Sequence, residues 1–250
     1  MRLDKFLVDC GVGSRTEVKK LLKNKQVTVN GQVETSRKQQ IDEKSDQIAV
    51  AGQVLSHETF VYYVLNKPKG VISATEDDRH RTVLDLLDNT ARQKEVFPVG
   101  RKEVFPVGRL DIDTHGLLLL TNNGQLAHVM LSPKKHVDKL YRAQVDGIMT
   151  QEDVERFAAG IELKDLTCQP AQLTILSTDE AKQTSLVDIT IREGKFHQVK
   201  RMVQACGKTV TDLQRLTMGP LRLDPKLALG EYRRLTAAEL KQLEVFGVEL

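Results

Sequence analysis

Residues 108–121, GRLDIDTHGLLLLT, decide the fold of this 250-residue chain. Its run of four leucines, residues 117–120, is too short for a helix and is bounded by Gly116 and by Asn122-Asn123-Gly124, so we expect a strand buried on both faces. Asp111 then stands on the loop that leads into the core. A carboxylate in that position loses hydration and needs a cationic partner to stay ionised. The stretch therefore indicates that the fold presents a reactive acid.

The composition is that of a globular protein. Apolar residues make up 40% of the chain, enough to bury a core, and we expect one large domain and a small one. No stretch is long and apolar enough to span a membrane, and the N-terminus lacks the apolar core of a signal peptide. Cys10, Cys168 and Cys206 are scattered, which fits a reducing compartment and gives neither a disulfide framework nor a zinc spacing. We therefore expect a cytoplasmic protein.

Positive charge is concentrated at the N-terminus. Residues 1–40 contain nine Lys or Arg and four acidic residues, a local net charge of +5. Because the whole chain carries +3, the other 210 residues together carry −2. Such clustering on a small segment is the electrostatic pattern of a module that binds a polyanion.

The same segment is predicted to fold as a compact unit. Ser14 followed by Glu17 is a capping-box pattern at the start of a helix, whose apolar stripe is Val18, Leu21 and Leu22. Valines then alternate through residues 27–33 around an Asn-Gly pair, which predicts a β-hairpin.

Five segments together resemble the RNA pseudouridine synthases of the RsuA type. Residues 108–121 resemble the catalytic motif of that family, and residues 66–70, NKPKG, resemble the loop that opens its catalytic domain. The further matches are residues 139–141 (KLY, the lysine and tyrosine motif), 193–202 (EGKFHQVKRM, the third motif) and 230–236 (GEYRRLT, the tail). They follow the family's order over nearly the whole chain, which is a stronger signal than any single motif.

The N-terminal segment resembles the S4-like RNA-binding domain. Helices followed by a Val-Thr-Val-Asn-Gly hairpin are typical of it, and residues 2–7, RLDKFL, resemble its opening. The resemblance implies that residues 1–56 bind RNA, through the basic side chains of Arg2, Lys5, Arg15, Lys19, Lys20 and Lys23. The alternative is a solvated lysine face without a ligand.

The rest of the chain alternates predicted strands and short helices. A linker at residues 55–60 is followed by a strand at 61–65, by strands at 139–145, 186–192 and 212–216, and by helices at 125–131, 151–159, 196–206 and 236–244. Antiparallel strands with helices between them give an α+β fold. The resemblance implies that residues 61–250 form a pseudouridine synthase domain, with a mixed, largely antiparallel β-sheet flanked by helices.

The resemblance implies that Asp111 is the catalytic residue. Turning uridine into pseudouridine breaks the N1–C1′ bond, rotates the base and joins C5 to C1′, and it requires no redox step, metal or other cofactor. The carboxylate could attack C1′ of the sugar or C6 of the base, or remove a sugar proton, and the sequence leaves these alternatives open. A purely structural alternative is that Asp111 caps a turn.

Two further residues are expected to bind the substrate. Tyr141 alternates with Lys139, Ala143 and Val145 on one face of the strand predicted at 139–145, where a tyrosine could simply be a core residue. The resemblance places it under the target uracil, where its ring can stack. Arg109 is expected either to hold a phosphate of the flipped-out nucleotide or to brace the loop.

Lys200 is the candidate cation for Asp111. The predicted helix at 196–206 has an apolar stripe formed by Phe196, Val199, Met202, Val203 and Cys206. Lys200 borders that buried face and can lean into the pocket, whereas the alternative is a solvated lysine.

A metal site is also conceivable at Asp111, Asp113 and His115, which form an Asp-x-Asp-x-His pattern. A turn expected at residues 114–116 would break the strand geometry that aligns these side chains, and no second ligand cluster follows. We therefore expect no metal, and we interpret Asp113 as a hydrogen-bond acceptor in the turn.

Residues 94–101, KEVFPVGR, are repeated without a gap as residues 102–109. The unit is too short to be a structural repeat, and the family pattern needs one copy. Because only the second copy continues into Leu110 and Asp111, the catalytic motif is assigned there and Arg101 is interpreted as part of a surface loop.

These observations predict an enzyme that isomerises a specific uridine in ribosomal RNA. We expect it to act as a monomer whose partner is that RNA, free or in an assembling small subunit. The third motif and the C-terminal half favour small-subunit 16S RNA over large-subunit 23S RNA. A non-catalytic rRNA-binding assembly factor and a metal-dependent nuclease are the alternatives. Intact Asp111, Tyr141 and Lys200 argue against the first, and the missing ligand set argues against the second.

Overall fold

The computed structural model describes residues 1–43, 45–55, 60–87 and 104–250. They fall into two compact units, the first within Met1–Val61 and the second formed by Tyr62–Leu87 and Phe105–Leu250. Residues 56–59 of the predicted linker and residues 94–103 of the duplicated octapeptide lie outside the described residues. In the described parts of the chain, every helix is too short or too polar to cross a membrane.

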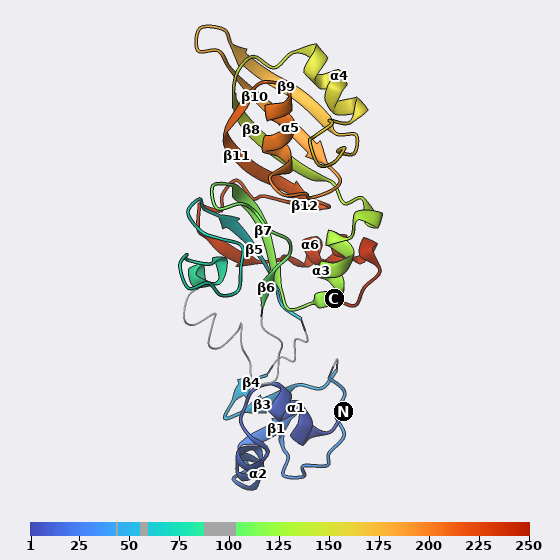
Figure 1. Ribbon diagram of the computed structural model, residues 1–250. Coiled ribbons are helices and arrows are strands. Elements are labelled where there is room, and N and C mark those ends of the chain that lie inside the picture. Colours follow the sequence, from blue (N-terminus) through green and yellow to red (C-terminus); the bar gives the residue numbers. More distant parts are fainter. Residues whose placement is uncertain (44, 56–59, 88–103) are drawn as a thin grey trace. The chain divides into compact units, whose positions relative to one another are not determined.

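The first unit contains two helices and a small antiparallel sheet (Figure 1). Its elements are α1 (Leu3–Asp9), α2 (Arg15–Lys23), β1 (Val27–Val29), β2 (Gln32–Val33), β3 (Ile48–Val50) and β4 (Gln53–Val54), with the strand order β2-β1-β3-β4. The predicted capping box is present, because the Ser14 side chain accepts from the backbone N–H of Glu17 and the Glu17 side chain accepts from that of Ser14. The predicted hairpin also forms, since β1 and β2 pair across Asn30 and Gly31, which both have positive φ.

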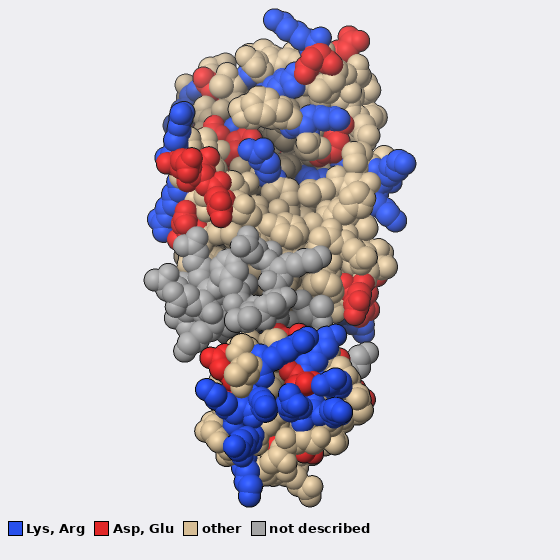
Figure 2. All heavy atoms as spheres, turned by 60° about the horizontal axis from the view of Figure 1, so that its bottom comes forward, with Lys and Arg blue, Asp and Glu red and all other residues tan. Residues whose placement is uncertain are grey.

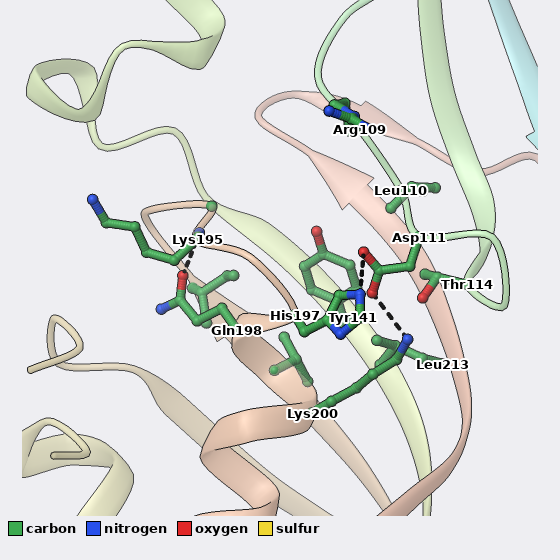
Figure 3. A pocket seen from close by; sticks show the side chains of 13 residues that line it. Arg109, Leu110, Asp111, Thr114, Tyr141, Lys195, His197, Gln198, Lys200 and Leu213 are labelled. Carbon is green, nitrogen blue, oxygen red and sulfur yellow. Dashed lines mark hydrogen bonds and ion pairs between the residues drawn. The ribbon is translucent and has the colours of Figure 1, made fainter. Parts of the chain in front are cut away.

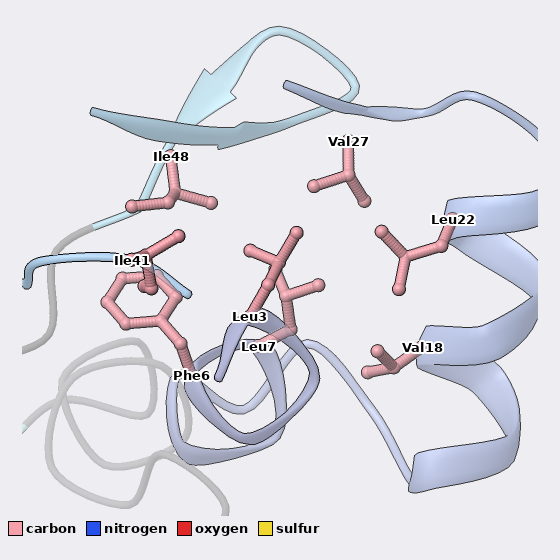
Figure 4. Close-up of a cluster of buried hydrophobic side chains, with 8 residues drawn as sticks. All are labelled: Leu3, Phe6, Leu7, Val18, Leu22, Val27, Ile41 and Ile48. Atoms are coloured by element: carbon pink, nitrogen blue, oxygen red, sulfur yellow. The ribbon is translucent and has the colours of Figure 1, made fainter. Parts of the chain in front are cut away.

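Apolar side chains from both helices and the sheet meet in one core in this unit (Figure 4). Its eight buried members are Leu3, Phe6, Leu7, Val18, Leu22, Val27, Ile41 and Ile48. Burying one face of each helix against the sheet leaves the opposite faces for the basic residues.

The second unit is built on one large sheet. Its order is β13-β5-β7-β11-β8-β10-β9, with β6 on β7 and β12 on β11. The strands are β5 (Tyr62–Lys67), β6 (Phe105–Pro106), β7 (His115–Thr121), β8 (Lys139–Asp146), β9 (Gln172–Asp179), β10 (Thr184–Ile191), β11 (Thr209–Met218), β12 (Leu221–Arg222) and β13 (Tyr232–Arg234). β7 pairs with β11 in parallel, and the other described pairings are antiparallel. The predicted mixed, largely antiparallel sheet is therefore confirmed, although β6, β9, β12 and β13 were not predicted.

Helices flank this sheet. They are α3 (Gly124–Leu131), α4 (Gln151–Ala159), α5 (Gln198–Ala205) and α6 (Ala237–Leu243), with the 3-10 turns η1 (Val83–Leu86), η3 (Pro133–Lys135) and η4 (Glu244–Phe246). α4 packs against β9 and α5 against β11 (Figure 1). The four leucines of β7 are each at most 1% exposed, as expected for a strand covered on both faces.

The helix predicted at residues 196–206 begins two residues later than expected. His197 adopts the left-handed conformation, with φ of +48°, and α5 starts at Gln198. Phe196 therefore precedes the helix and is 77% exposed, so its assignment to the buried stripe is wrong. The rest of the stripe, Val199, Met202, Val203 and Cys206, is buried.

The turn expected at residues 114–116 lies earlier, at Ile112 and Asp113, where the backbone N–H of Thr114 donates to the carbonyl of Asp111. Gly116 instead belongs to β7, opposite Arg215 of β11, and has φ of +104°. A Cβ there would lie 2.8 Å from the backbone nitrogen of Arg215. The close approach of these two strands explains the glycine.

Candidate active site

The carboxylate of Asp111 lies between two basic side chains from the start of α5. Lys200 Nζ donates to Asp111 Oδ2 at 2.9 Å, and His197 Nε2 lies 3.6 Å from Asp111 Oδ1 (Figure 3). The Asp111 side chain is 28% exposed, so it is partly shielded from solvent. The structure thus brings together the acid and the cation that the sequence pattern suggested, and it adds a histidine.

Lys200 bridges two carboxylates. Its ammonium also donates to Asp113 Oδ1, and the Asp113 side chain is 65% exposed. Burial alone would lower the pKa of Lys200, but the hydrogen bonds with Asp113 and Asp111 outweigh it and raise that pKa. The hydrogen bond from Lys200 in turn lowers the pKa of Asp113. Lys200 therefore remains an ammonium at neutral pH.

A buried lysine holds the loop that carries Asp111 through hydrogen bonds to its backbone. Lys67, at the end of β5, is fully buried, and its Nζ donates to the carbonyls of Pro68 (3.1 Å), Asp111 (3.0 Å) and Thr114 (2.9 Å). Burial lowers the pKa of Lys67 to about 8, against the opposing attraction of Asp111 and Asp113. This ammonium determines the path of the backbone on both sides of the turn.

The neighbouring segment braces the same loop. Ser73 Oγ accepts from the backbone N–H of Leu110 at 2.9 Å and donates to its carbonyl at 3.0 Å. The backbone N–H of Gly70 donates to the carbonyl of Ile112 at 2.7 Å. The NKPKG segment thus supports the loop that presents Asp111, which is a physical reason for finding both in one protein.

Adjacent strands supply the floor of the site. Side chains alternate along β8, so that Lys139, Tyr141, Ala143 and Val145 are buried on one face. Lys139 Nζ donates to the carbonyl of Val137 at 3.0 Å, and burial together with nearby Arg215 lowers the pKa of Lys139 to about 8. Arg215 is 2% exposed and its Nε donates to the carbonyl of Leu117 at 2.7 Å.

Two cavities meet at Asp111. The smaller, about 70 Å³, is lined by Asp111, Tyr141, His197 and Lys200 among others (Figure 3). The larger, about 660 Å³, shares Arg109, Asp111, Tyr141 and His197 with it and extends to Lys139 and Arg215. That volume is in the range of sites that bind small molecules or a single nucleotide. Arg109 is exposed, so it lines both cavities from their solvent side.

The Asp-x-Asp-x-His pattern does not converge. Asp111 and Asp113 both face Lys200, whereas His115 Nε2 lies 3.1 Å from Asp212 Oδ2 on β11. Lys69 forms an ion pair with the same Asp212. These three side chains therefore connect the NKPKG segment, β7 and β11.

The basic residues of the first unit are exposed. Arg2, Lys5, Arg15, Lys19, Lys20 and Lys23 all face solvent, with the last three on the outer side of α2. Figure 2 shows Lys and Arg side chains gathered on the face of this unit that is turned toward the viewer. Arg2 is engaged with Asp4, to which its guanidinium donates twice.

The sequence pattern missed two residues of this site. Lys67 could have been recognised as a charged residue at the end of an apolar strand, because such a residue needs buried partners. His197 was not recognised, because the pattern of residues 196–206 predicted it to be helical. Its position depends on its left-handed conformation just before α5.

Family models match both units of the chain. Residues 61–205 match the model described as RNA pseudouridylate synthase, and residues 1–48 match the S4 domain. The solved structure described as pseudouridylate synthase is 34% identical in sequence, with a TM-score of 0.64, and covers 97% of this chain and 99% of its own.

Similar proteins span nearly the full chain. The uncharacterized RNA pseudouridine synthase YtzG of Bacillus subtilis (strain 168) is 44% identical, covering 97% of this chain and 98% of its own. The ribosomal large subunit pseudouridine synthase B of the same organism is 41% identical (98% and 96%). The ribosomal small subunit pseudouridine synthase A of Vibrio vulnificus (strain CMCP6) is 40% identical (96% and 98%).

Proposed function

Because the chain belongs to the RNA pseudouridine synthase family and begins with an S4 domain, we propose that it isomerises a specific uridine of ribosomal RNA to pseudouridine. The observation that carries the proposal is the carboxylate of Asp111, paired with Lys200 and exposed to a cavity large enough for a nucleotide. In this proposal the reaction uses no cofactor, and the isomerisation involves no net oxidation or reduction.

Asp111 is the catalytic residue in this proposal. The N1–C1′ bond of the uridine breaks and the C5–C1′ bond forms, while C5 loses its hydrogen as a proton and N1 takes up a proton. Lys200 Nζ donates to the carboxylate at 2.9 Å and orients it beside the cavity, where it can act as a nucleophile or as a base. Attack at C1′, attack at C6 and removal of a sugar proton are all compatible with this geometry.

Tyr141 and Arg109 bind the flipped-out nucleotide. Tyr141 is 8% exposed and lines both cavities beside Asp111, where its ring can stack on the uracil. Arg109 lies two residues before Asp111 and is exposed at the entrance, where a guanidinium suits a phosphate. A base taken out of its stack needs both kinds of contact.

In this proposal the S4 domain, residues 1–56, binds RNA near the target uridine, and residues 61–250 form the catalytic domain. Arg2, Lys5, Arg15, Lys19, Lys20 and Lys23 supply the phosphate contacts, which position RNA without reading its bases. We place the enzyme in the cytoplasm, where ribosomal RNA is made and assembled, and we propose that it acts as a monomer.

Small-subunit 16S RNA is our preferred substrate, because the third motif and the C-terminal half resemble the small-subunit enzymes. Relatives named for either subunit reach almost the same identity, so that overall similarity does not discriminate between them. Parallel incubation with labelled 16S and 23S transcripts distinguishes the two substrates, since the enzyme should release tritium from one and not from the other.

The test uses ribosomal RNA labelled with tritium at C5 of uracil. Isomerisation must release that hydrogen, an assembly factor releases none, and a nuclease shortens the RNA. The Asp111→Asn variant keeps the shape of the side chain and removes its charge, so release should cease while RNA affinity changes little. Asp113→Asn is the matched control, because its carboxylate binds the same Lys200 but is 65% exposed. Wild-type release by Asp111→Asn would refute the mechanism.

A further inference from the structure

An exposed aromatic pair stands beside the cavity that contains Asp111. The rings of Phe196 and His197 stack with their centroids 3.8 Å apart and their planes 15° from parallel. Phe196 is 77% exposed, the same exposed fraction as Val245, and no other exposed large apolar side chain among the described residues exceeds it. One ring face of Phe196 is thus covered by His197, and the other faces solvent.

The backbone around this pair is firmly held. His197 has φ of +48°, a conformation that residues other than glycine adopt at an energetic cost. Gln198 is buried, and its side chain accepts from the backbone N–H of Lys195 at 3.0 Å and donates to buried Glu193 at 2.7 Å. Glu193 also accepts from the backbone N–H of Gln169 at 2.9 Å. This network of hydrogen bonds holds the strained backbone at His197, which directs the Phe196 ring into solvent.

The pair lies on the cavity of about 660 Å³ that also contains Asp111 and Tyr141. Two other exposed apolar side chains line this cavity, Ile112 (41% exposed) and Leu131 (43% exposed). Lys195 and Arg109 line it as well and add positive charge. The rim therefore combines a flat aromatic surface, apolar side chains and cations, which is the combination that binds single-stranded nucleic acid.

When a uridine leaves its stack, the neighbouring base loses one stacking partner. We propose that the free face of Phe196, supported by His197, stacks on a base next to the target uridine and so positions the RNA for catalysis. Tyr141 is too deeply buried, at 8% exposure, to serve a second base in addition to the target. The inference rests on the proposed function, because it assumes that a flipped-out uridine enters this cavity.

Four variants test the stacking. Phe196→Ala removes the ring, Phe196→Leu keeps an apolar side chain without a ring, and Phe196→Trp keeps an aromatic ring. Val245→Ala is the control, because Val245 has the same exposed fraction and does not line the cavity. We expect kcat/KM for tritium release from 16S or 23S transcripts to fall at least about five-fold in Phe196→Ala and Phe196→Leu, and to stay near the wild-type value in the other two.

A second measurement reports stacking directly and does not depend on catalysis. A single-stranded RNA containing 2-aminopurine is titrated with each protein, since stacking on an aromatic ring quenches the fluorescence of that base. Wild type and Phe196→Trp should quench it, and Phe196→Ala and Phe196→Leu should quench it less. If the wild type quenches the fluorescence and Phe196→Ala does not, but the wild type releases no tritium, RNA stacking on Phe196 stands and the proposed function is overturned.

Two results would overturn the inference while the proposed function survives. One is a Phe196→Ala protein whose kcat/KM stays within two-fold of the wild-type value and whose quenching is unchanged. The other is a Phe196→Leu protein with the wild-type kcat/KM, which would show that the surface makes a general apolar contact and does not stack on a base.

Discussion

The ammonium of Lys67 lies 3.0 Å from the backbone carbonyl of Asp111, although 44 residues separate them in the chain. The same nitrogen donates to the carbonyls of Pro68 and Thr114, so one buried charge fixes the loop that presents the Asp111 carboxylate. In the proposed function Lys67 is a positioning residue, because it contacts the backbone of Asp111 and not its side chain.

Lys67→Met should therefore destabilise the protein and reduce turnover. Three carbonyls, two of them partly buried and one buried, would lose their donor, which we expect to lower the free energy of unfolding by about 2–4 kcal/mol. Denaturant unfolding measures this change. Lys69→Met is the control in the same segment, because its ion pair with Asp212 is half exposed and should contribute less than about 1 kcal/mol. Equal stability losses in the two variants would contradict this role for Lys67.

Lys200→Met should reduce kcat for tritium release. The substitution removes the ammonium that donates to Asp111 Oδ2 at 2.9 Å and to Asp113, so the Asp111 carboxylate loses the side chain that orients it. Lys200→Arg is the conservative control, because its guanidinium keeps the positive charge and the donors. An unchanged kcat in Lys200→Met would contradict this role for Lys200.

Gly116→Ala should disrupt the junction between β7 and β11. The added Cβ would meet the backbone of Arg215, and the φ of +104° suits glycine alone, so we expect a loss of roughly 2–4 kcal/mol in unfolding free energy. Gly124→Ala is the matched control, because a Cβ at the start of α3 meets no atom within 4 Å. Thermal unfolding of both variants checks the prediction, and a stable Gly116→Ala protein would show that the two strands can separate.

Buried Lys139 should make stability rise with pH in a defined window. Its pKa in the folded protein is lowered to about 8 from 10.5, so the folded state releases its proton first. The cost of burying the charge is fully present below pH 8 and is lost as the pH rises to about 10.5. The unfolding free energy of the wild type, minus that of Lys139→Met, should therefore increase across this window. A constant difference would mean that Lys139 titrates normally.

Changing Lys19, Lys20 and Lys23 to Ala should weaken RNA binding. Each phosphate contact on single-stranded RNA contributes about 0.7 to the slope of log affinity against log salt, so the slope should flatten by about two units. Maximal turnover at saturating RNA should be nearly unchanged. Lys182, Lys226 and Lys241 changed together to Ala provide a control of equal charge on the other unit. If the first triple variant binds normally at every salt concentration, these lysines do not grip RNA.

Much of the architecture was readable from the sequence, because it depends on local patterns. The capping box at Ser14, the Asn-Gly hairpin and the buried strand of four leucines are set by neighbouring residues, and each is present. Strand alternation likewise placed Lys139 and Tyr141 on one face of β8, which the structure shows to be buried. The order of the motifs was enough to identify the family.

Tertiary structure decided what the periodicity could not. A helical pattern predicted Phe196 to be buried, but the polar network of Glu193 and Gln198 delays the start of α5 and turns that ring into solvent. Lys67 and His197 reach Asp111 across 44 and 86 residues, through pairings of β5 with β7 and of β7 with β11. Contacts between distant segments depend on sheet order and on backbone conformation at single residues, and neither leaves a repeating pattern in the sequence.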